Sequence, residues 1–264
     1  MKLRFSRKQL AIPYAIFMIL FIVLPLLLIV YYAFTDANGV FTLDNFTNIF
    51  SQQSNFIVIL RSILVGFINT LGCILIGYPI AYILSNKKYN KNKVLVYMFI
   101  IPMWINFVIR TIATKELLFW IGISSANYPL LSTMIGMIYN YLPFAILPLY
   151  TTMLKLDKSQ IEASLDLGAN PVVCFFKTIL PMSMPGIVSA ATMTFMPTMS
   201  SYVIADKLGG GKTTLIGNLI SFQFNQANYN LGSVLSLIML VMIAISLLAT
   251  KKVKKEENVR GNLW

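Results

Sequence analysis

Residues 10–34 read LAIPYAIFMILFIVLPLLLIVYYAF and contain no charged side chain. An α-helix needs about 20 consecutive apolar residues to cross the hydrocarbon core of a bilayer. A second uncharged run, residues 231–249 (LGSVLSLIMLVMIAISLLA), is close to that length. The two runs predict helices that span a membrane.

The composition of the whole chain supports the same interpretation. Of its 264 residues, 57% are hydrophobic and only 11% are charged, which is outside the range of ordinary soluble domains. The first run is longer than the apolar core of a signal peptide, so we expect it to remain as a span. We predict an all-α, polytopic membrane protein with a single membrane domain over residues 1–264. Its six expected transmembrane helices lie near residues 10–34, 56–84, 94–113, 130–154, 179–205 and 231–250.

The net charge of +12 is distributed as a topology signal and not as a nucleic-acid-binding surface. Lys and Arg concentrate in the loops on the cytoplasmic side of a membrane. Sixteen of the 21 precede the first span, follow the last span, or lie in the loops 85–93 and 155–178. The five others are Arg61, Arg110, Lys115, Lys207 and Lys212. We therefore expect both termini in the cytoplasm, anionic lipid as a partner of the basic loops, and no nucleic-acid partner.

Several classes of function lack the residues that they require. The chain has no histidine, and Cys73 and Cys174 lack the spacing of metal ligands, so we expect no metal, no cofactor and no enzymatic activity. Residues 209–214 (GGGKTT) do not complete a nucleotide-binding P-loop, because Asp206 stands where that motif needs a glycine. A secondary transporter driven by an ion gradient is a less favoured alternative, since that class typically has internal repeats and ionisable residues at mid-membrane.

The loop 155–178 has its own helical signals. Ser159 and Glu162 have the spacing of a capping box, which makes Gln160 the first residue of a helix over about 160–167. Gly168 follows as the residue that ends this helix, where a positive φ is favoured. Asn170 and Pro171 then start a second helix as its cap and first residue. The pattern predicts two short helices joined by a glycine turn, which we call the knob (residues 155–178).

The knob resembles the EAA loop of ABC importer permeases. Residues 162–168 (EASLDLG), followed by residues 178–181 (TILP), carry the resemblance, with Ser164 in place of the second alanine and Thr178 in place of an aliphatic residue. Further similarity to the spermidine/putrescine (PotB-type) family lies in residues 77–82 (GYPIAY), 101–104 (IPMW), 141–144 (YLPF) and 209–212 (GGGK). The resemblance covers roughly residues 60–240.

The resemblance implies a type I ABC importer permease fold in the bacterial cell membrane. This chain would form half of a translocation pore for polyamines, together with a second, related permease. Two cytosolic ATPase subunits would bind ATP, and an extracytoplasmic polyamine-binding protein would deliver the substrate. Coupling to the ATPase would involve Glu162, Ala163, Asp166, Gly168, Asn170 and Pro171. An importer permease for another small solute stays open as the alternative.

Candidate pathway residues are aromatic or acidic. Aromatic rings attract an organic cation by about 0.5–2 kcal/mol each, and an acidic side chain near the outer end of a span also attracts cations. The candidates are Trp104, Tyr139, Tyr141, Tyr202 and Asp206. The competing interpretation is that the aromatic residues pack or anchor helices, and that Asp206 is solvated or paired with Lys207 or Arg110.

Overall fold

The structure is a computed structural model that describes residues 11–86, 90 and 94–261. Within these residues all regular elements are helices, apart from one isolated bridge between Thr35 and Phe41. The expected all-α class is therefore confirmed. The cations that were expected to mark the cytoplasmic side lie in part outside the described residues, namely Lys2, Arg4, Arg7, Lys8, Lys87, Lys88, Lys91 and Lys93.

Four helical segments of the described chain are long and apolar enough to cross a membrane. The first, Ile12–Ala33, joins α1 (Ala11–Met18), η1 (Ile19–Val23) and α2 (Leu24–Ala33). The others are α4 (Gln53–Ser85), α7 (Pro129–Met153) and the part of α14 (Tyr229–Gly261) up to Thr250. Two bent helix pairs raise the number of candidate spans to six if each pair is one span.

The first bent pair occupies the expected span 94–113, which is not one continuous helix. Helices α5 (Val94–Ile100) and η2 (Ile101–Trp104) are followed by α6 (Phe107–Trp120), and the pair is bent by 99°. Asn106 caps the start of α6, because its side-chain oxygen accepts hydrogen bonds from the backbone N–H groups of Val108 and Ile109 at 2.9 and 3.3 Å.

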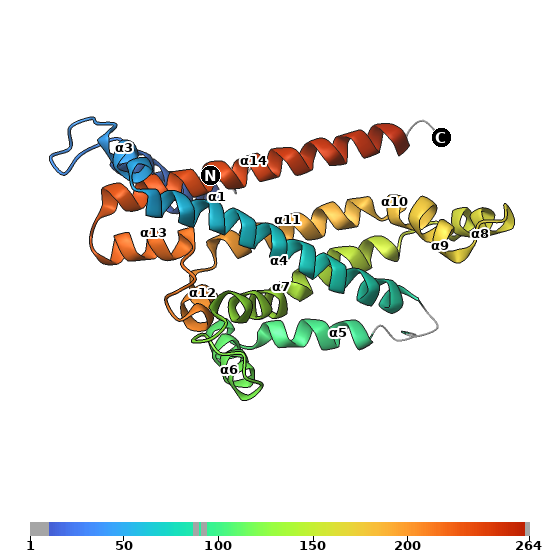
Figure 1. The fold of residues 1–264 in the computed structure, drawn as a ribbon. Helices are drawn as coiled ribbons and strands as arrows, with labels where there is room; N and C mark the ends of the chain where they lie inside the picture. Colours follow the sequence, from blue (N-terminus) through green and yellow to red (C-terminus); the bar gives the residue numbers. More distant parts are fainter. Residues whose placement is uncertain (1–10, 87–89, 91–93, 262–264) are drawn as a thin grey trace, which may run out of the picture. The chain divides into compact units, whose positions relative to one another are not determined.

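The second bent pair occupies the expected span 179–205. Helices α9 (Pro171–Cys174), η3 (Phe175–Ile179) and α10 (Leu180–Met182) lead out of the knob, and α11 (Met184–Ser200) follows after a bend of 63°. A further break at Ser201 separates α11 from α12 (Tyr202–Gly209). The expected single helix is thus divided twice, and its first part begins inside the knob (Figure 1).

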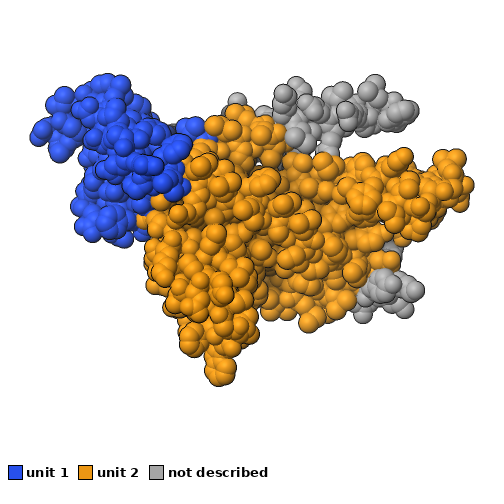
Figure 2. All heavy atoms as spheres, viewed as in Figure 1, with its two compact units in different colours: residues 1–57, 219–241 blue, residues 58–218, 242–264 orange. Residues whose placement is uncertain are grey.

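The described chain forms two compact units, residues 1–57 with 219–241 and residues 58–218 with 242–264, coloured separately in Figure 2. The larger unit packs α11 and α12 against α7, and α4 contributes to the same apolar core. Glycines allow the close approach of these helices: a Cβ on Gly136 of α7 would overlap the Leu208 side chain of α12. Such small residues are typical of helix contacts in membranes.

The smaller unit contains a helix that the composition of residues 35–55 did not predict. That stretch lies between the first two expected spans, and α3 (Asp44–Ser51) forms there and buries Ile49. Its Asn45 side chain donates to the backbone oxygens of Ala33 and Thr35 at 3.2 and 2.8 Å. These two bonds fix the helix against the end of α2. Part of α13 (Ile216–Asn225) completes this unit.

Candidate functional site

The first helix of the knob, α8 (Lys158–Asp166), begins two residues earlier than the sequence pattern predicted. Its cap is Asp157, whose carboxylate accepts from the Ser159 backbone N–H at 3.0 Å and from the Ser159 hydroxyl at 2.8 Å. The expected capping box of Ser159 and Glu162 is therefore wrong, since a carboxylate two residues earlier takes both groups.

The turn after α8 agrees with the expectation. Gly168 has φ +87°, and the backbone N–H groups of Gly168 and Ala169 donate to the carbonyls of Leu165 and Ser164 at 2.9 and 3.1 Å. Asn170 caps the next helix by accepting from the Val173 N–H at 2.8 Å, and Pro171 is its first residue. Two short helices joined by a glycine turn are thus confirmed.

The knob presents apolar and acidic side chains to its surroundings. Leu167 is 89% exposed, and Val172 and Phe176 are also largely exposed. Glu162 is exposed as well, and no hydrogen bond or ion pair to its carboxylate occurs among the described residues. Exposed apolar groups together with an unpaired acid on the same knob are suited to contact another protein.

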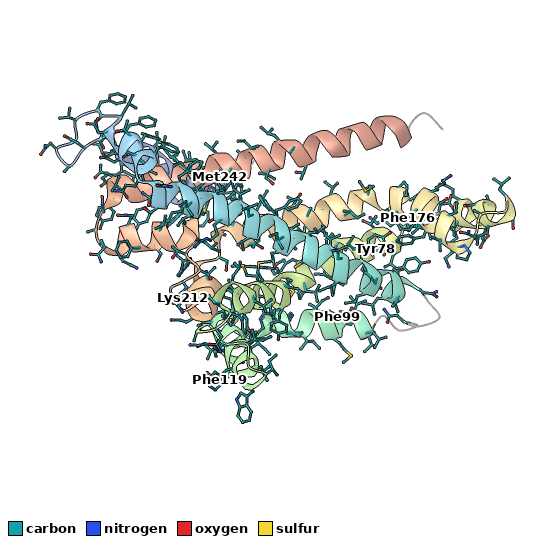
Figure 3. The ribbon with its side chains drawn as sticks, viewed as in Figure 1. Tyr78, Phe99, Phe119, Phe176, Lys212 and Met242 are labelled. Atoms are coloured by element: carbon teal, nitrogen blue, oxygen red, sulfur yellow. The ribbon has the colours of Figure 1, made fainter. Side chains whose placement is uncertain are left out.

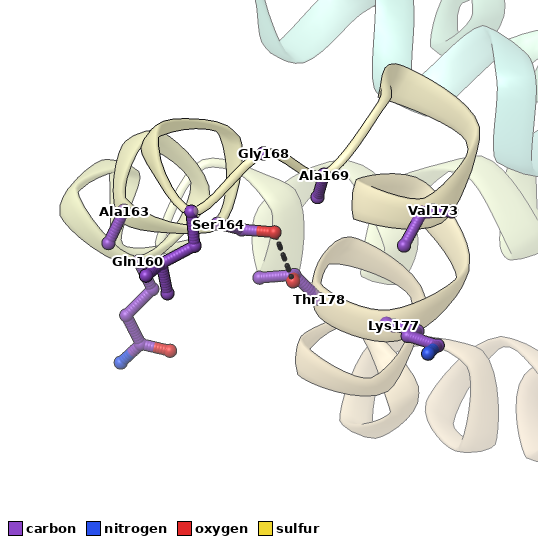
Figure 4. A pocket seen from close by; sticks show the side chains of 9 residues that line it. Gln160, Ala163, Ser164, Gly168, Ala169, Val173, Lys177 and Thr178 are labelled. Atoms are coloured by element: carbon purple, nitrogen blue, oxygen red, sulfur yellow. Dashed lines mark hydrogen bonds between the residues drawn. The ribbon is translucent and has the colours of Figure 1, made fainter.

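An open groove of about 620 Å³ lies between the two helices of the knob. Figure 4 shows Gln160 and Ala163 on its α8 side and Val173 and Lys177 on the other. Thr178 donates to the hydroxyl of Ser164 across the groove at 3.1 Å. These are the two residues that depart from the family pattern, and the structure makes them hydrogen-bond partners.

Aromatic contacts join the knob to α4 within the larger unit. The Phe175 ring lies edge-on to Tyr78, with centroids 5.7 Å apart, and also to Tyr82 at 6.5 Å. The Tyr78 and Ser183 hydroxyls share a hydrogen bond of 2.8 Å at the bend before α11. Figure 3 shows Tyr78 on α4, with Phe176 on the neighbouring helix of the knob. The knob is therefore in direct contact with α4, and through Tyr78 with the start of α11.

The five candidate pathway residues make no hydrogen bond or ring contact with one another in the described structure. Trp104 is 88% exposed, and Tyr139 and Tyr202 are about half exposed. Tyr141 is buried, and its hydroxyl donates to the Pro197 carbonyl at 3.2 Å. Asp206 pairs with Lys207 at 3.0 Å, which agrees with the alternative interpretation of that side chain.

Two polar residues inside the larger unit were not singled out from the sequence. Asn140 accepts from the Arg110 Nε at 2.8 Å, and Asn69 donates to the Thr198 hydroxyl at 2.7 Å. Both asparagines are fully buried. Asparagine within an apolar run is the available sequence signal, because a buried amide in a membrane span needs a polar partner.

The arrangement of the helices is the one found in chains of ABC transporters. A solved structure described as a bacterial alginate ABC transporter in complex with an alginate pentasaccharide-bound periplasmic protein contains a chain of the same fold. Its TM-score is 0.71 at 13% sequence identity, covering 94% of this chain and 93% of that one. A likeness at this identity concerns the fold alone.

The chain belongs to the binding-protein-dependent transport system inner membrane component family, whose model matches residues 73–254. It is 33% identical to the spermidine/putrescine transport system permease protein PotB of Escherichia coli (strain K12), over 88% of this chain and 91% of the relative. The PotB of Haemophilus influenzae is also 33% identical, with 98% of both chains covered. The protein is thus a multi-pass membrane permease.

Proposed function

We propose that this chain is the permease subunit that forms half of a translocation pore for spermidine and putrescine in an ATP-driven importer. The choice of substrate is supported by the 33% identity to PotB proteins over most of both chains. The chain itself breaks no bond in this proposal, and ATP is bound by a separate subunit.

The knob is the proposed docking element for that ATPase. Its exposed Leu167 and unpaired Glu162 are suited to a protein partner, and Phe175 joins it to α4. A partner changes a conformational equilibrium only if it binds the two conformations with different affinity. We propose that Glu162, Ala163, Asp166, Gly168, Asn170 and Pro171 supply or support that difference when ATPase subunits close.

The proposed topology has six spans with both termini in the cytoplasm. The contact between Tyr82, near the end of α4, and Phe175 in the knob supports one common side for the end of α4 and the knob. At the other end of the same unit, Lys212 donates to the Ala126 carbonyl at 3.1 Å. The loops rich in Lys and Arg would then face the cytoplasm, as the distribution of charge favours.

The proposed assembly contains a second, related permease, two cytosolic ATPase subunits and an extracytoplasmic polyamine-binding protein. The alginate transporter of the same fold was solved in complex with a periplasmic protein, which supports an equivalent partner here. The outer end of the fifth expected span, where Asp206 was expected to attract cations, would receive the polyamine. Trp104, Tyr139 and Tyr202 would offer aromatic faces to it along the pathway. Tyr141 lies deeper, at the break between α11 and α12.

Uptake of labelled spermidine and putrescine by cells that carry the whole transport system tests both parts of this proposal. We expect ATP-dependent uptake with the wild-type chain, and its loss with Glu162→Lys at normal membrane insertion. Asp44→Lys is the matched control, because Asp44 is another exposed carboxylate whose side chain makes no ion pair in the described structure. Uptake unaffected by Glu162→Lys would contradict the docking role, whereas a wild-type system that takes up neither polyamine would contradict the substrate.

A further inference from the structure

The break between α11 and α12 leaves backbone and side-chain oxygens without their helical partners. Ser201 has φ −73° and ψ 96°, and its N–H donates to the Thr198 carbonyl at 3.2 Å. The Pro197 carbonyl, which would otherwise accept from that N–H in a continuous helix, accepts from the Tyr141 hydroxyl instead. The break is thereby fixed to the middle of α7.

The orientation of the Asn69 amide at this break follows from the bonding of Thr198. The Thr198 hydroxyl has one proton, which it donates to the Thr194 carbonyl at 2.6 Å. Toward Asn69 it can therefore only accept, so the Asn69 NH₂ group faces it at 2.7 Å. The Asn69 side-chain oxygen is left as a fully buried acceptor without any donor among the described residues.

Ser201 supplies a second buried oxygen at the break, about one helical turn after Thr198. It occupies the cap position of α12, yet its hydroxyl caps no backbone N–H and, within the described part of the chain, has no hydrogen-bond partner although it is buried. Its side chain lies beside the Tyr141 hydroxyl. The Tyr141 oxygen donates its proton to Pro197, so its lone pairs remain available as acceptors.

Two of these residues lie near the middle of helices that are long enough to span a membrane, which corresponds to mid-membrane depth. Asn69 is at the centre of α4 (Gln53–Ser85), and Tyr141 is at the centre of α7 (Pro129–Met153). Unpaired polar atoms are costly at that depth, and when present they usually mark a transport path. Broken helices whose freed oxygens meet a cation near the midplane are a recurring arrangement in membrane transport.

We propose that Asn69, Ser201 and Tyr141 form a transient site for one protonated primary amine of the substrate as it passes the break in α11. This inference rests on the proposed function. An alkylammonium group offers three N–H donors and no acceptor, which suits three oxygens with free lone pairs. All three oxygens are neutral.

The competing explanation is an ordered water that satisfies the same oxygens. Variants at Asn69 separate the two explanations. Asn69→Asp keeps an acceptor oxygen for an ammonium group, whereas Asn69→Leu keeps only the size of the side chain. If these residues have a structural role alone, Asn69→Asp should lower uptake more than Asn69→Leu, because it buries an unpaired carboxylate. If they bind an ammonium group, Asn69→Asp should lower uptake less than Asn69→Leu.

The experiment measures spermidine uptake and ATP hydrolysis by the complete transport system in proteoliposomes. We expect Asn69→Leu to lower the uptake rate about tenfold, the loss of one hydrogen bond to a charged donor, while ATP hydrolysis stimulated by the loaded binding protein stays within about twofold. Ser201→Ala should lower uptake by several-fold, and Asn69→Asp should transport faster than Asn69→Leu. Ser132→Ala is the matched control, because its hydroxyl is also buried without a partner in the described structure but lies about 13 Å along α7 from Tyr141.

Each outcome supports or overturns the site. Wild-type uptake rates in Asn69→Leu and Ser201→Ala would overturn it and leave the water explanation, with the proposed function intact. Slower uptake by Asn69→Asp than by Asn69→Leu would also overturn it. A wild-type system without polyamine uptake would overturn the proposed function and this site with it. Where Asn69→Leu fails to insert into the membrane, Ser201→Ala, which removes one oxygen, decides between the two explanations.

Discussion

The ring of Phe175 in the knob meets the ring of Tyr78 on α4 edge to face, with centroids 5.7 Å apart and planes at 87°. Such pairs contribute about 0.5–1.5 kcal/mol beyond the area that they bury. The hydrogen bond between Tyr78 and Ser183 lies beside this pair, at the bend where α11 begins. One aromatic contact therefore connects the proposed docking surface to two helices of the larger unit.

Phe175→Ala is expected to separate ATP hydrolysis from transport. The substitution removes the contacts with Tyr78 and Tyr82 but leaves the exposed Leu167 and Glu162 unchanged. We expect uptake to fall by about tenfold, which corresponds to a loss of about 1.4 kcal/mol of coupling free energy. ATP hydrolysis should be largely retained. The measurement is the number of substrate molecules imported for each ATP hydrolysed in proteoliposomes.

Tyr78→Phe is the matched variant for that measurement. It keeps the ring and removes only the hydroxyl that bonds with Ser183, so a smaller loss of uptake is expected. Equal ratios of import to hydrolysis in wild type and Phe175→Ala would refute transmission through this aromatic pair.

Asp157→Ala is expected to loosen the first turn of α8. Removal of a cap costs about 1 kcal/mol, and a helix of this length has little stability of its own. Hydrogen exchange at the Ser159 amide, which donates to Asp157, should become several-fold faster. Ser159→Ala should change the exchange of the helix little, because its hydroxyl donates to Asp157 and does not cap α8. If Ser159→Ala accelerated exchange more than Asp157→Ala, the result would support the capping box that the sequence pattern predicted.

The local signals of the knob could be predicted from the sequence because each depends on neighbours. Gly168 permits a positive φ, and Asn170 and Pro171 start a helix wherever they stand before one. Asp157 was missed because two residues competed for one cap, and Ser159 had the spacing to Glu162 that a capping box requires. The breaks at Asn106 and Ser201 lie inside apolar runs, where composition indicates a continuous span.

The buried polar pairs could not be predicted for a different reason. Asn69 and Thr198 are 129 residues apart in the chain, and Arg110 and Asn140 are 30 apart. Such partners are set by the packing of helices, which a single sequence does not reveal. The unpaired oxygens at the break in α11 are therefore a property of the fold. The pathway residues chosen from the sequence were mostly aromatic side chains at exposed positions.

Acidification is expected to loosen the loop after α2. The backbone N–H of Val40 donates to the Asp36 carboxylate at 2.8 Å, as does that of Asn38, and these bonds hold the Asp36 pKa below its usual value of 3.8. A lowered pKa in the folded state means that the stabilisation is complete above pH 3.8 and is lost as the pH falls through the folded value.

Hydrogen exchange of the Val40 amide measures this loss. Its protection, relative to an unfolded chain at the same pH, should be constant near neutral pH and decrease below pH 3.8. In Asp36→Ala the protection should be low at every pH. A pH profile that is the same in the wild type and in Asp36→Ala would exclude the carboxylate as its cause.

Replacement of Arg110 is expected to destabilise the larger unit even when the charge is kept. Only 7% of this residue is exposed, and its guanidinium donates from Nε to Asn140 and from Nη1 to the Pro102 carbonyl at 2.8 and 2.9 Å. It thereby joins α7 to the break between η2 and α6. The ring of Tyr139 lies 5.8 Å from the guanidinium carbon.

Arg110→Lys leaves one of these two acceptors without a donor, because an ammonium group lacks the planar fork of arginine. A lost hydrogen bond to a charged group costs about 1.5–3 kcal/mol, so the midpoint of thermal unfolding in detergent should fall by several degrees. Lys115→Met, which removes an exposed cation from the same helix, should leave the midpoint nearly unchanged. If Arg110→Lys unfolded at the wild-type temperature, the two bonds would contribute nothing to the bend, and the 99° angle would depend on the Asn106 cap alone.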